Sequence, residues 1–157
     1  MTEGRVAFLN VSDGGVPKRA VESADVTRDG MRGDRQRNLK FHGGRDRALC
    51  LWSLERIVAL RAEGHPVAAG STGENVTVEG VDWAEIAPGI LLRLGSVVAE
   101  LTEYTKPCRT IAGSFRQGRS GRISQKAHPG WSRVYARVLE EGRVAVGDPV
   151  VLLEPGR

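Results

Sequence analysis

The stretch ILLRLGSVVAELTEY, residues 90–104, contains two apolar segments separated by a Gly-Ser pair. Residues 90–94 and 97–104 are rich in Leu, Ile and Val and have the length of β-strands. Gly95 and Ser96 are residue types that favour a tight turn between two strands. The stretch therefore predicts a hairpin, and it is the clearest indication of the fold class in the chain.

The same arrangement recurs near the C-terminal end, where residues 143–146 and 150–154 flank the turn pair Gly147-Asp148. About ten short, evenly spaced strands are expected over the whole chain, and a sheet of that kind removes its exposed edges by closing into a barrel. The high content of Gly, 20 of 157 residues, and the low content of aromatic residues, 5%, also favour short strands over a helical bundle. We predict a mainly β, barrel-like fold built from sequential hairpins.

One segment, about residues 53–63, is predicted to be an α-helix. Ser53 is a favourable N-cap, apolar residues recur at helical spacing after it, and Gly64 followed by Pro66 ends the pattern. Residues 83–87 are expected to add a single helical turn. The segment after Val134 is ambiguous between helix and strand, and its β-branched residues favour a strand.

Length and composition limit the class of protein. A chain of 157 residues suits one domain over residues 1–157, and 40% apolar residues are enough for a core. Two Cys cannot form a disulfide scaffold. The first ten residues do not resemble a secretory signal, and the longest apolar run, residues 48–52, is too short to span a bilayer. A cytoplasmic protein with reduced thiols and no membrane contact is expected.

Positive charge is concentrated in two segments. Residues 28–47 contain seven Lys or Arg and three Asp, and residues 106–133 contain seven Lys or Arg and no acidic residue. If the two segments meet in space they form a cationic basin, which would attract a phosphate-bearing cofactor, an acidic substrate or nucleic acid. Nucleic acid is the least favoured, because Phe115 and Trp131 are the only aromatic residues in the second segment and stacking partners are scarce.

Cys108 is the strongest candidate for chemistry. It follows Pro107 and lies between Lys106 and Arg109. Neighbouring cations stabilise a thiolate, so Cys108 could be a nucleophile or a ligand for a soft metal, although the local context taken alone favours an ordinary half-buried Cys. Cys50, by contrast, lies within an apolar run and is predicted to belong to the core.

Other candidate residues give weaker signals. His42 precedes two glycines that would let the backbone approach a ligand closely, but it could equally be a turn residue. Asn75 is a polar residue at the start of a predicted strand, while His65 and His128 are expected on surface loops. The three His and two Cys have no recognisable metal-site spacing, and signatures of hydrolases, kinases and dinucleotide-binding proteins are absent.

Taken in order, several short motifs resemble those of MOSC domains, which are named for the C-terminal domain of molybdenum cofactor sulfurases. The motifs are Pro17-Lys18, residues 30–34, His42-Gly43-Gly44 with Ala48-Leu49-Cys50, residues 73–77, Pro107-Cys108 and residues 142–148. The resemblance extends from about Val11 to Glu154 and is strongest for small stand-alone bacterial members.

This resemblance implies a β-barrel domain that binds the molybdenum cofactor, a pterin dithiolene carrying a phosphate. Cys108 matches the Cys that ligates molybdenum in the reducing members of the family. Asn75 matches a family motif, Lys18 matches a basic residue near the cofactor phosphate, His42 matches the small bacterial members, and Arg35 is a looser match to a basic cofactor contact. Lys106 and Arg109, which flank Cys108, are also expected to contact the cofactor, because cations suit a terminal phosphate.

The function implied is reduction of N-hydroxylated compounds by a molybdenum-dependent oxidoreductase. The sequence contains no group that stores electrons, so an electron-donating flavin or iron–sulfur protein is implied as partner. Two alternatives remain open: a sulfur carrier or sulfurtransferase holding a persulfide on Cys108, and a non-enzymatic binder of anions or nucleic acid.

Overall fold

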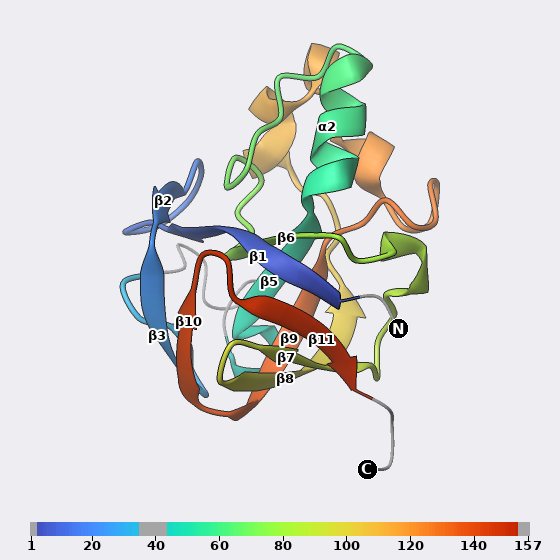
Figure 1. The fold of residues 1–157 in the computed structure, drawn as a ribbon. Helices are drawn as coiled ribbons and strands as arrows, with labels where there is room; N and C mark the ends of the chain where they lie inside the picture. Colours follow the sequence, from blue (N-terminus) through green and yellow to red (C-terminus); the bar gives the residue numbers. More distant parts are fainter. Residues whose placement is uncertain (1–2, 35–43, 154–157) are drawn as a thin grey trace.

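The structure is a computed structural model that describes residues 3–34 and 44–153. A large sheet contains eight strands, named here in spatial order: β11 (Pro149–Leu153), β7 (Leu91–Leu94), β8 (Val97–Tyr104), β9 (Val134–Glu140), β5 (Leu49–Ser53), β6 (Val76–Glu79), β1 (Glu3–Val11) and β2 (Arg19–Val21). A small sheet contains β10 (Gly142–Ala145), β3 (Ser23–Thr27) and β4 (Gly30–Met31). Figure 1 shows the large sheet curved around an interior.

The large sheet closes into a barrel of seven strands, because β11 pairs both with β7 and with β1. Strand β2 pairs with β1 outside this ring. Side chains from all sides of the ring fill its interior, and Leu9, Leu51, Leu92, Leu101 and Val134 are almost completely buried. The predicted mainly β barrel is confirmed, including the hairpin of β7 and β8 and the strand assigned to the ambiguous segment after residue 134.

A helix crosses over between the only two parallel neighbours in the described part of the barrel, β5 and β6. Helix α2 (Leu54–Ala62) begins directly after β5. The Ser53 hydroxyl oxygen accepts a hydrogen bond from the Arg56 N–H and caps the helix, and Gly64 follows its end with a φ of +99°, which few other residues adopt. The predicted helix over residues 53–63 is thus confirmed within one residue at each end.

The predicted C-terminal hairpin is wrong. Strand β10 pairs with β3 in the small sheet, while β11 leaves to close the barrel. The turn between them is fixed by β1: the Val6 N–H donates to the Asp148 carbonyl, and the Gly147 N–H donates to the Val6 carbonyl. The turn residues are therefore bonded to a third strand, and the two flanking strands diverge instead of pairing.

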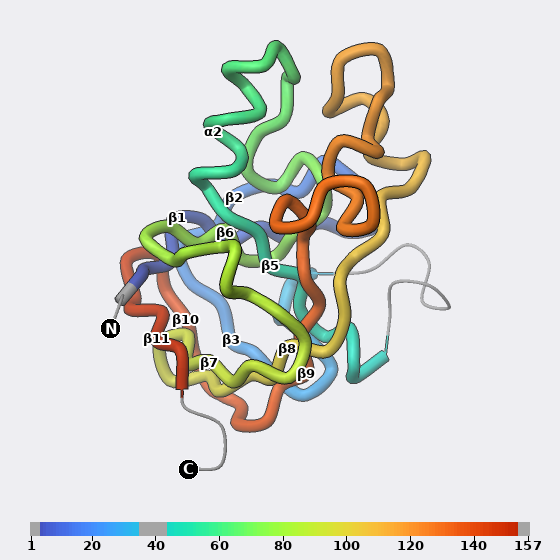
Figure 2. The backbone as a smooth tube through the Cα atoms, turned by 90° about the vertical axis from the view of Figure 1, so that its right-hand side faces the viewer, coloured from blue at the N-terminus to red at the C-terminus, as the bar shows by residue number. Residues whose placement is uncertain are grey.

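The long segment between β8 and β9 is more ordered than a polar loop. It contains three short 3₁₀ helices, η3 (Arg109–Ser114), η4 (Arg116–Gly118) and η5 (Ser120–Ile123). Ile111, Phe115 and Ile123 are buried beneath them. Figures 1 and 2 both place this segment beside α2 at one end of the barrel.

Two further 3₁₀ turns complete the secondary structure, η1 (Arg45–Arg47) and η2 (Trp83–Glu85), the second of which was expected from the sequence. Within the described ranges, no helix has the length and apolar character needed to cross a membrane.

Candidate functional site

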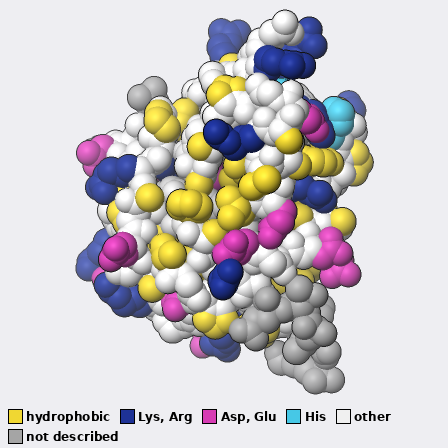
Figure 3. Space-filling model, turned by 45° about the horizontal axis from the view of Figure 1, so that its top comes forward, with side chains coloured by type: hydrophobic (Ala, Val, Ile, Leu, Met, Phe, Trp, Pro, Cys, Tyr) yellow, Lys and Arg dark blue, Asp and Glu magenta, His cyan; other side chains and the backbone are white. Residues whose placement is uncertain are grey.

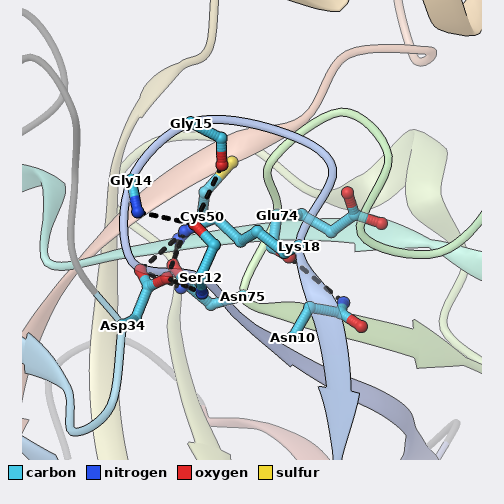
Figure 4. Close-up of polar contacts among 9 residues, drawn as sticks. All are labelled: Asn10, Ser12, Gly14, Gly15, Lys18, Asp34, Cys50, Glu74 and Asn75. Carbon is cyan, nitrogen blue, oxygen red and sulfur yellow. Dashed lines mark hydrogen bonds and ion pairs between the residues drawn. The ribbon is translucent and has the colours of Figure 1, made fainter.

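A buried ion pair lies near the end of β1, in what we call the Lys18–Asp34 cluster (Ser12, Lys18, Asp34 and Asn75; Figure 4). The Lys18 Nζ lies 2.6 Å from both carboxylate oxygens of Asp34. The Ser12 backbone N–H donates to Asp34 Oδ1 at 2.9 Å, and Asn75 Nδ2 donates to Oδ2 at 2.7 Å. The side chains of Lys18 and Asp34 are only 7% and 5% exposed, so the pair is nearly shielded from water.

The amide of Asn75 is held in one orientation by the neighbouring strand. The Cys50 backbone N–H donates to Asn75 Oδ1 at 3.0 Å, while the Asn75 N–H donates to the Cys50 carbonyl at 2.8 Å. Because Oδ1 is occupied as an acceptor, the NH₂ group must face the other way, toward Asp34. The pairing of β5 with β6 thereby fixes a donor in the cluster.

The loop before β6 is built around a second buried carboxylate, that of Glu74. It accepts hydrogen bonds from the Gly70 N–H and from the hydroxyls of Thr72 and Thr77, at 2.9 to 3.1 Å. Burial raises the pKa of Glu74 above its usual value, and these hydrogen bonds oppose the shift. The Glu74 carboxylate thus holds the loop in place through hydrogen bonds, and the loop ends at Asn75.

Arg133 connects this loop to the segment that carries Cys108. Its guanidinium donates to the Thr72 carbonyl at 2.6 Å and to the Lys106 carbonyl at 3.3 Å. The residue is 4% exposed, and its Nε has no hydrogen-bond partner among the described residues. A buried cation bonded only to backbone carbonyls within the described part of the chain is unusual, because buried charges are normally paired with an opposite charge.

Cys108 precedes η3 and is partly exposed. Its Sγ lies 2.8 Å from the Thr110 Oγ1. Lys106 and Arg109 on either side are exposed. Together with Arg116, Arg119 and Lys126, they form what we call the cationic loop, and none of these five makes an ion pair with any described residue. Figure 3 shows Lys and Arg side chains standing together along the upper rim of the molecule.

Aromatic stacking anchors this segment to α2. The Trp131 ring is contacted by two guanidinium groups, Arg56 at 4.5 Å and Arg122 at 4.1 Å from its centroid. Arg122 also donates two 2.9 Å hydrogen bonds to Glu63, which lower the pKa of that carboxyl. His65 was expected on the surface, but its Nδ1 accepts from the Arg116 N–H and its side chain is only 9% exposed.

The first basic segment differs from the second. Its described cations are largely paired: Arg28 with Glu141, Arg45 with Asp29, and Arg47 with Glu103. Its Asp46 pairs with an arginine of β9. Three of the four described cations of residues 28–47 are therefore paired, whereas three further cations of that segment lie outside the described residues.

The predicted site residues fall into two groups. Lys18 and Asn75 meet in the Lys18–Asp34 cluster, whereas Lys106, Cys108 and Arg109 lie on the segment after β8. Arg35 and His42 lie outside the described residues. Cys50 is buried as predicted, and it contacts Asn75 through its backbone N–H and the Thr105 hydroxyl, at 3.6 Å, through its Sγ.

Asp34 and Arg133 were not among the predicted site residues. Asp34 belongs to a Gly-Asp turn, and nothing in its local sequence indicates that a lysine 16 positions earlier is its partner. Arg133 was only counted as one charge among seven, although its place directly before an apolar strand was a signal of partial burial. Both acquire their role only through contacts between distant segments.

The described residues contain no group of three or more His, Cys, Asp or Glu that could hold a metal ion. A metal at Cys108 would therefore need ligands from a bound group in addition to those that the described residues offer. A partly exposed thiol with unpaired cations beside it suits such a group, since a thiolate is a soft ligand and cations attract an anionic cofactor.

The chain is similar in sequence to known proteins. A sequence profile described as "MOSC domain" matches residues 38–151. The chain is 33% identical over 144 residues to YflK of Bacillus subtilis (strain 168), covering 90% of this chain and 64% of that protein. It is 28% identical over 133 residues to YiiM of Escherichia coli (strain K12), covering 82% and 58%. The chain thus spans less than two thirds of the length of these relatives.

Solved structures have the same fold. YiiM from Geobacillus stearothermophilus superposes with a TM-score of 0.76 at 25% identity, over 98% of this chain and 76% of that one. The YUAD protein of Bacillus subtilis superposes with a TM-score of 0.76 at 18% identity, over 96% of this chain and 97% of that one. The closed barrel with one longer helix is shared by these structures.

Proposed function

Because the chain belongs to the MOSC domain family, we propose that it binds the molybdenum cofactor and reduces N-hydroxylated compounds, with Cys108 as the protein ligand of the metal. When bound, the cofactor would supply the two-electron chemistry of molybdenum, and the protein would supply position and electrostatic field. The family resemblance supports the cofactor class, and the surroundings of Cys108 support the residue.

The observation that carries this proposal is the exposure of one thiol next to cations that no described carboxylate neutralises. Cys108 is reachable from solvent, whereas Cys50 is buried and has a pKa raised by burial. Lys106 and Arg109, which flank Cys108 in the sequence and are exposed, would attract an anionic ligand toward it. Cys108 is therefore the thiol suited to ligation.

Other residues would hold this ligand in place. Arg133 ties the Lys106 carbonyl to the Thr72 carbonyl, which fixes the Cys108 segment against the loop that carries Asn75. The stacking of Trp131 anchors the other end of the same segment to α2. We propose Arg35 and His42 as further cofactor contacts on the strength of the resemblance alone.

Reduction of an N–OH group consumes two electrons and two protons and releases the oxygen as water. The chain offers no group that stores two electrons, so the proposal includes an electron donor containing a flavin or an iron–sulfur cluster. The unpaired positive charge of the cationic loop favours a donor with an acidic docking face, because complementary charge accelerates encounter.

The test is the metal and pterin content of protein purified from a host that makes the cofactor. We expect molybdenum and pterin in near-stoichiometric amounts in the wild type and a loss of at least tenfold in Cys108→Ala. Cys50→Ala is the matched control and should retain both, because its thiol is enclosed by protein. Wild-type protein that holds neither molybdenum nor pterin, and takes up none on addition of cofactor, would contradict the proposal.

The same preparations distinguish the sulfur-carrier alternative. Mass spectrometry after incubation with a cysteine desulfurase reports an added sulfur on Cys108 if that residue carries a persulfide. A persulfide in protein that holds no molybdenum would favour the carrier over the reductase.

A further inference from the structure

The Lys18–Asp34 cluster has the donor arrangement of an anion-binding site. A lysine ammonium, a backbone N–H and a side-chain amide NH₂ all point at one carboxylate, with donor–acceptor distances of 2.6 to 2.9 Å (Figure 4). Ammonium groups and backbone N–H groups of this kind are the usual ligands of phosphate and carboxylate anions. In this chain, the anion they receive is the side chain of Asp34.

The Ser12 N–H, the Asn75 NH₂ group and the backbone of Lys18 are each held by contacts that do not involve Asp34. The Ser12 hydroxyl donates to the Gly15 carbonyl and accepts from the Gly14 N–H, which shapes the turn that presents the Ser12 N–H. The Lys18 N–H donates to the Gly70 carbonyl at 2.9 Å. Gly70 also lets the two backbones approach closely, because a Cβ there would lie 2.8 Å from the Lys18 carbonyl oxygen.

The third donor, Asn75, is oriented by Cys50, as described above. Removal of the Asp34 carboxylate would therefore leave two preformed donors, the Ser12 N–H and the Asn75 NH₂ group, with the Lys18 ammonium on a backbone held by Gly70. Asp34 itself is attached differently. It ends the turn after β4, where its N–H donates to the Met31 carbonyl, so its side chain comes from an edge of the small sheet and not from the barrel.

We propose that the Lys18–Asp34 cluster is an anion site for a phosphate or carboxylate group, and that Asp34 occupies it as an exchangeable internal anion. A tethered carboxylate has a high effective concentration at its own site, so a free anion in solution competes with it poorly. A ligand that is also anchored elsewhere can displace it. Asp34 would thus exclude free phosphate and admit only a ligand held at a second point.

In the context of the proposed function, on which this part rests, the second point would be Cys108 and the entering group the phosphate of the cofactor. Arg133 couples the two places, since it bonds both the loop that carries Asn75 and the segment that carries Cys108. The anion site itself does not depend on that function and can be tested without the cofactor.

The test is chemical rescue of Asp34→Ala by acetate and by inorganic phosphate, measured as thermal unfolding of the full chain. The variant should unfold about 10 °C below the wild type, because the buried ammonium has lost its counter-charge. Acetate or phosphate should restore most of this loss in a saturable way in the millimolar range. Chloride at the same ionic strength should not, and neither anion should raise the unfolding temperature of the wild type in that range.

Two controls separate a site from general salt effects. Asp29→Ala removes an exposed carboxylate that pairs with Arg45, and acetate should leave its unfolding temperature unchanged. The double variant Lys18→Met/Asp34→Ala lacks the ammonium and should lose the rescue. Equal effects of acetate, phosphate and chloride on Asp34→Ala would show that the ion pair is only structural and would overturn the proposal. So would a variant that cannot be recovered folded even in the presence of acetate or phosphate.

Pterin content then tests the exchange separately. If the wild type carries the cofactor, Asp34→Ala should retain it more firmly during dialysis, because its internal competitor is gone, whereas Lys18→Met should release it faster. Anion rescue in a protein that never carries pterin would support the anion site and reject the proposed function. Pterin that dialyses from Asp34→Ala as fast as from the wild type would overturn the exchange.

Discussion

The Lys18–Asp34 cluster and the cationic loop use the same kind of residue in opposite ways. The cluster encloses its one cation, 7% exposed, with a carboxylate 5% exposed. The cationic loop keeps five cations in water, and no described carboxylate pairs with them. A buried charge is costly unless it is paired, while an exposed charge needs no partner. Burial, more than residue type, therefore decides whether a Lys or Arg in this protein is part of the fold or available to a ligand.

The contrast changes the interpretation of Lys18. From the family resemblance, Lys18 was expected to lie near the cofactor phosphate. In the structure its ammonium already has an anionic partner, and that partner also holds Ser12 and Asn75. Lys18 is thus a structural residue in the absence of ligand, and whether it also contacts a phosphate remains the prediction tested above.

The largest effect on stability is expected for Lys18→Met, which removes the positive charge but keeps most of the apolar volume. It leaves the Asp34 carboxylate buried without its counter-charge, at a cost of about 3–5 kcal/mol in the free energy of unfolding. Arg45→Met breaks the exposed pair with Asp29 and should cost less than about 1 kcal/mol. Urea unfolding of both variants measures the difference, and equal costs would show that burial does not decide how much an ion pair contributes to stability.

A smaller, pH-dependent effect is expected for Glu74→Gln. Burial raises the pKa of Glu74 above its ordinary value of 4.5, so the unfolded chain releases this proton at lower pH than the folded protein does. The contribution of Glu74 to stability is therefore fully present below about pH 4.5 and is lost as the pH rises through the raised pKa. Gln cannot titrate, so the variant should lack this decline while keeping an acceptor for the Gly70 N–H.

Urea unfolding at a series of pH values from mildly acidic to mildly alkaline tests this expectation. Glu79→Gln is the matched control, since Glu79 is half-exposed on the barrel surface and pairs with Arg5. The control should keep the wild-type decline with pH. A Glu74→Gln variant whose stability falls with pH as steeply as that of the wild type would assign the decline to another group.

The sequence was sufficient where a feature depends on local pattern. The hairpin of residues 90–104 and the helix after Ser53 were predicted because alternation, turn residues and capping are encoded within a few positions. It was insufficient where pairing depends on distant partners. The C-terminal strands have the pattern of a hairpin, but their turn is bonded to Val6, and the sequence near residue 147 contains no trace of that contact.

The site follows the same rule. Cys108 was predicted as a site residue because its cations are adjacent in sequence, and Asn75 and Lys18 were predicted through motifs. Asp34 is 16 positions from Lys18 and 41 from Asn75, and Arg133 is 61 positions from Thr72. Periodicity and spacing carry no information about contacts that only the closed barrel creates. Arg35 and His42 lie outside the described residues, so their role stays a prediction.

The smallest effect on stability, and the sharpest contrast with Lys18, is expected for Arg109→Ala and Arg119→Ala. Both side chains are exposed and make no ion pair with a described residue, so each change should alter the free energy of unfolding by less than about 0.5 kcal/mol.

If the cationic loop receives an acidic electron donor, the double variant should be reduced more slowly by a small acidic flavoprotein at low salt. The difference from the wild type should shrink as salt screens the charges. Stopped-flow reduction of cofactor-loaded protein at several ionic strengths measures this effect. Equal reduction rates of the double variant and the wild type at every ionic strength would show that the cationic loop does not take part in electron transfer. The expected effect on stability does not depend on that result.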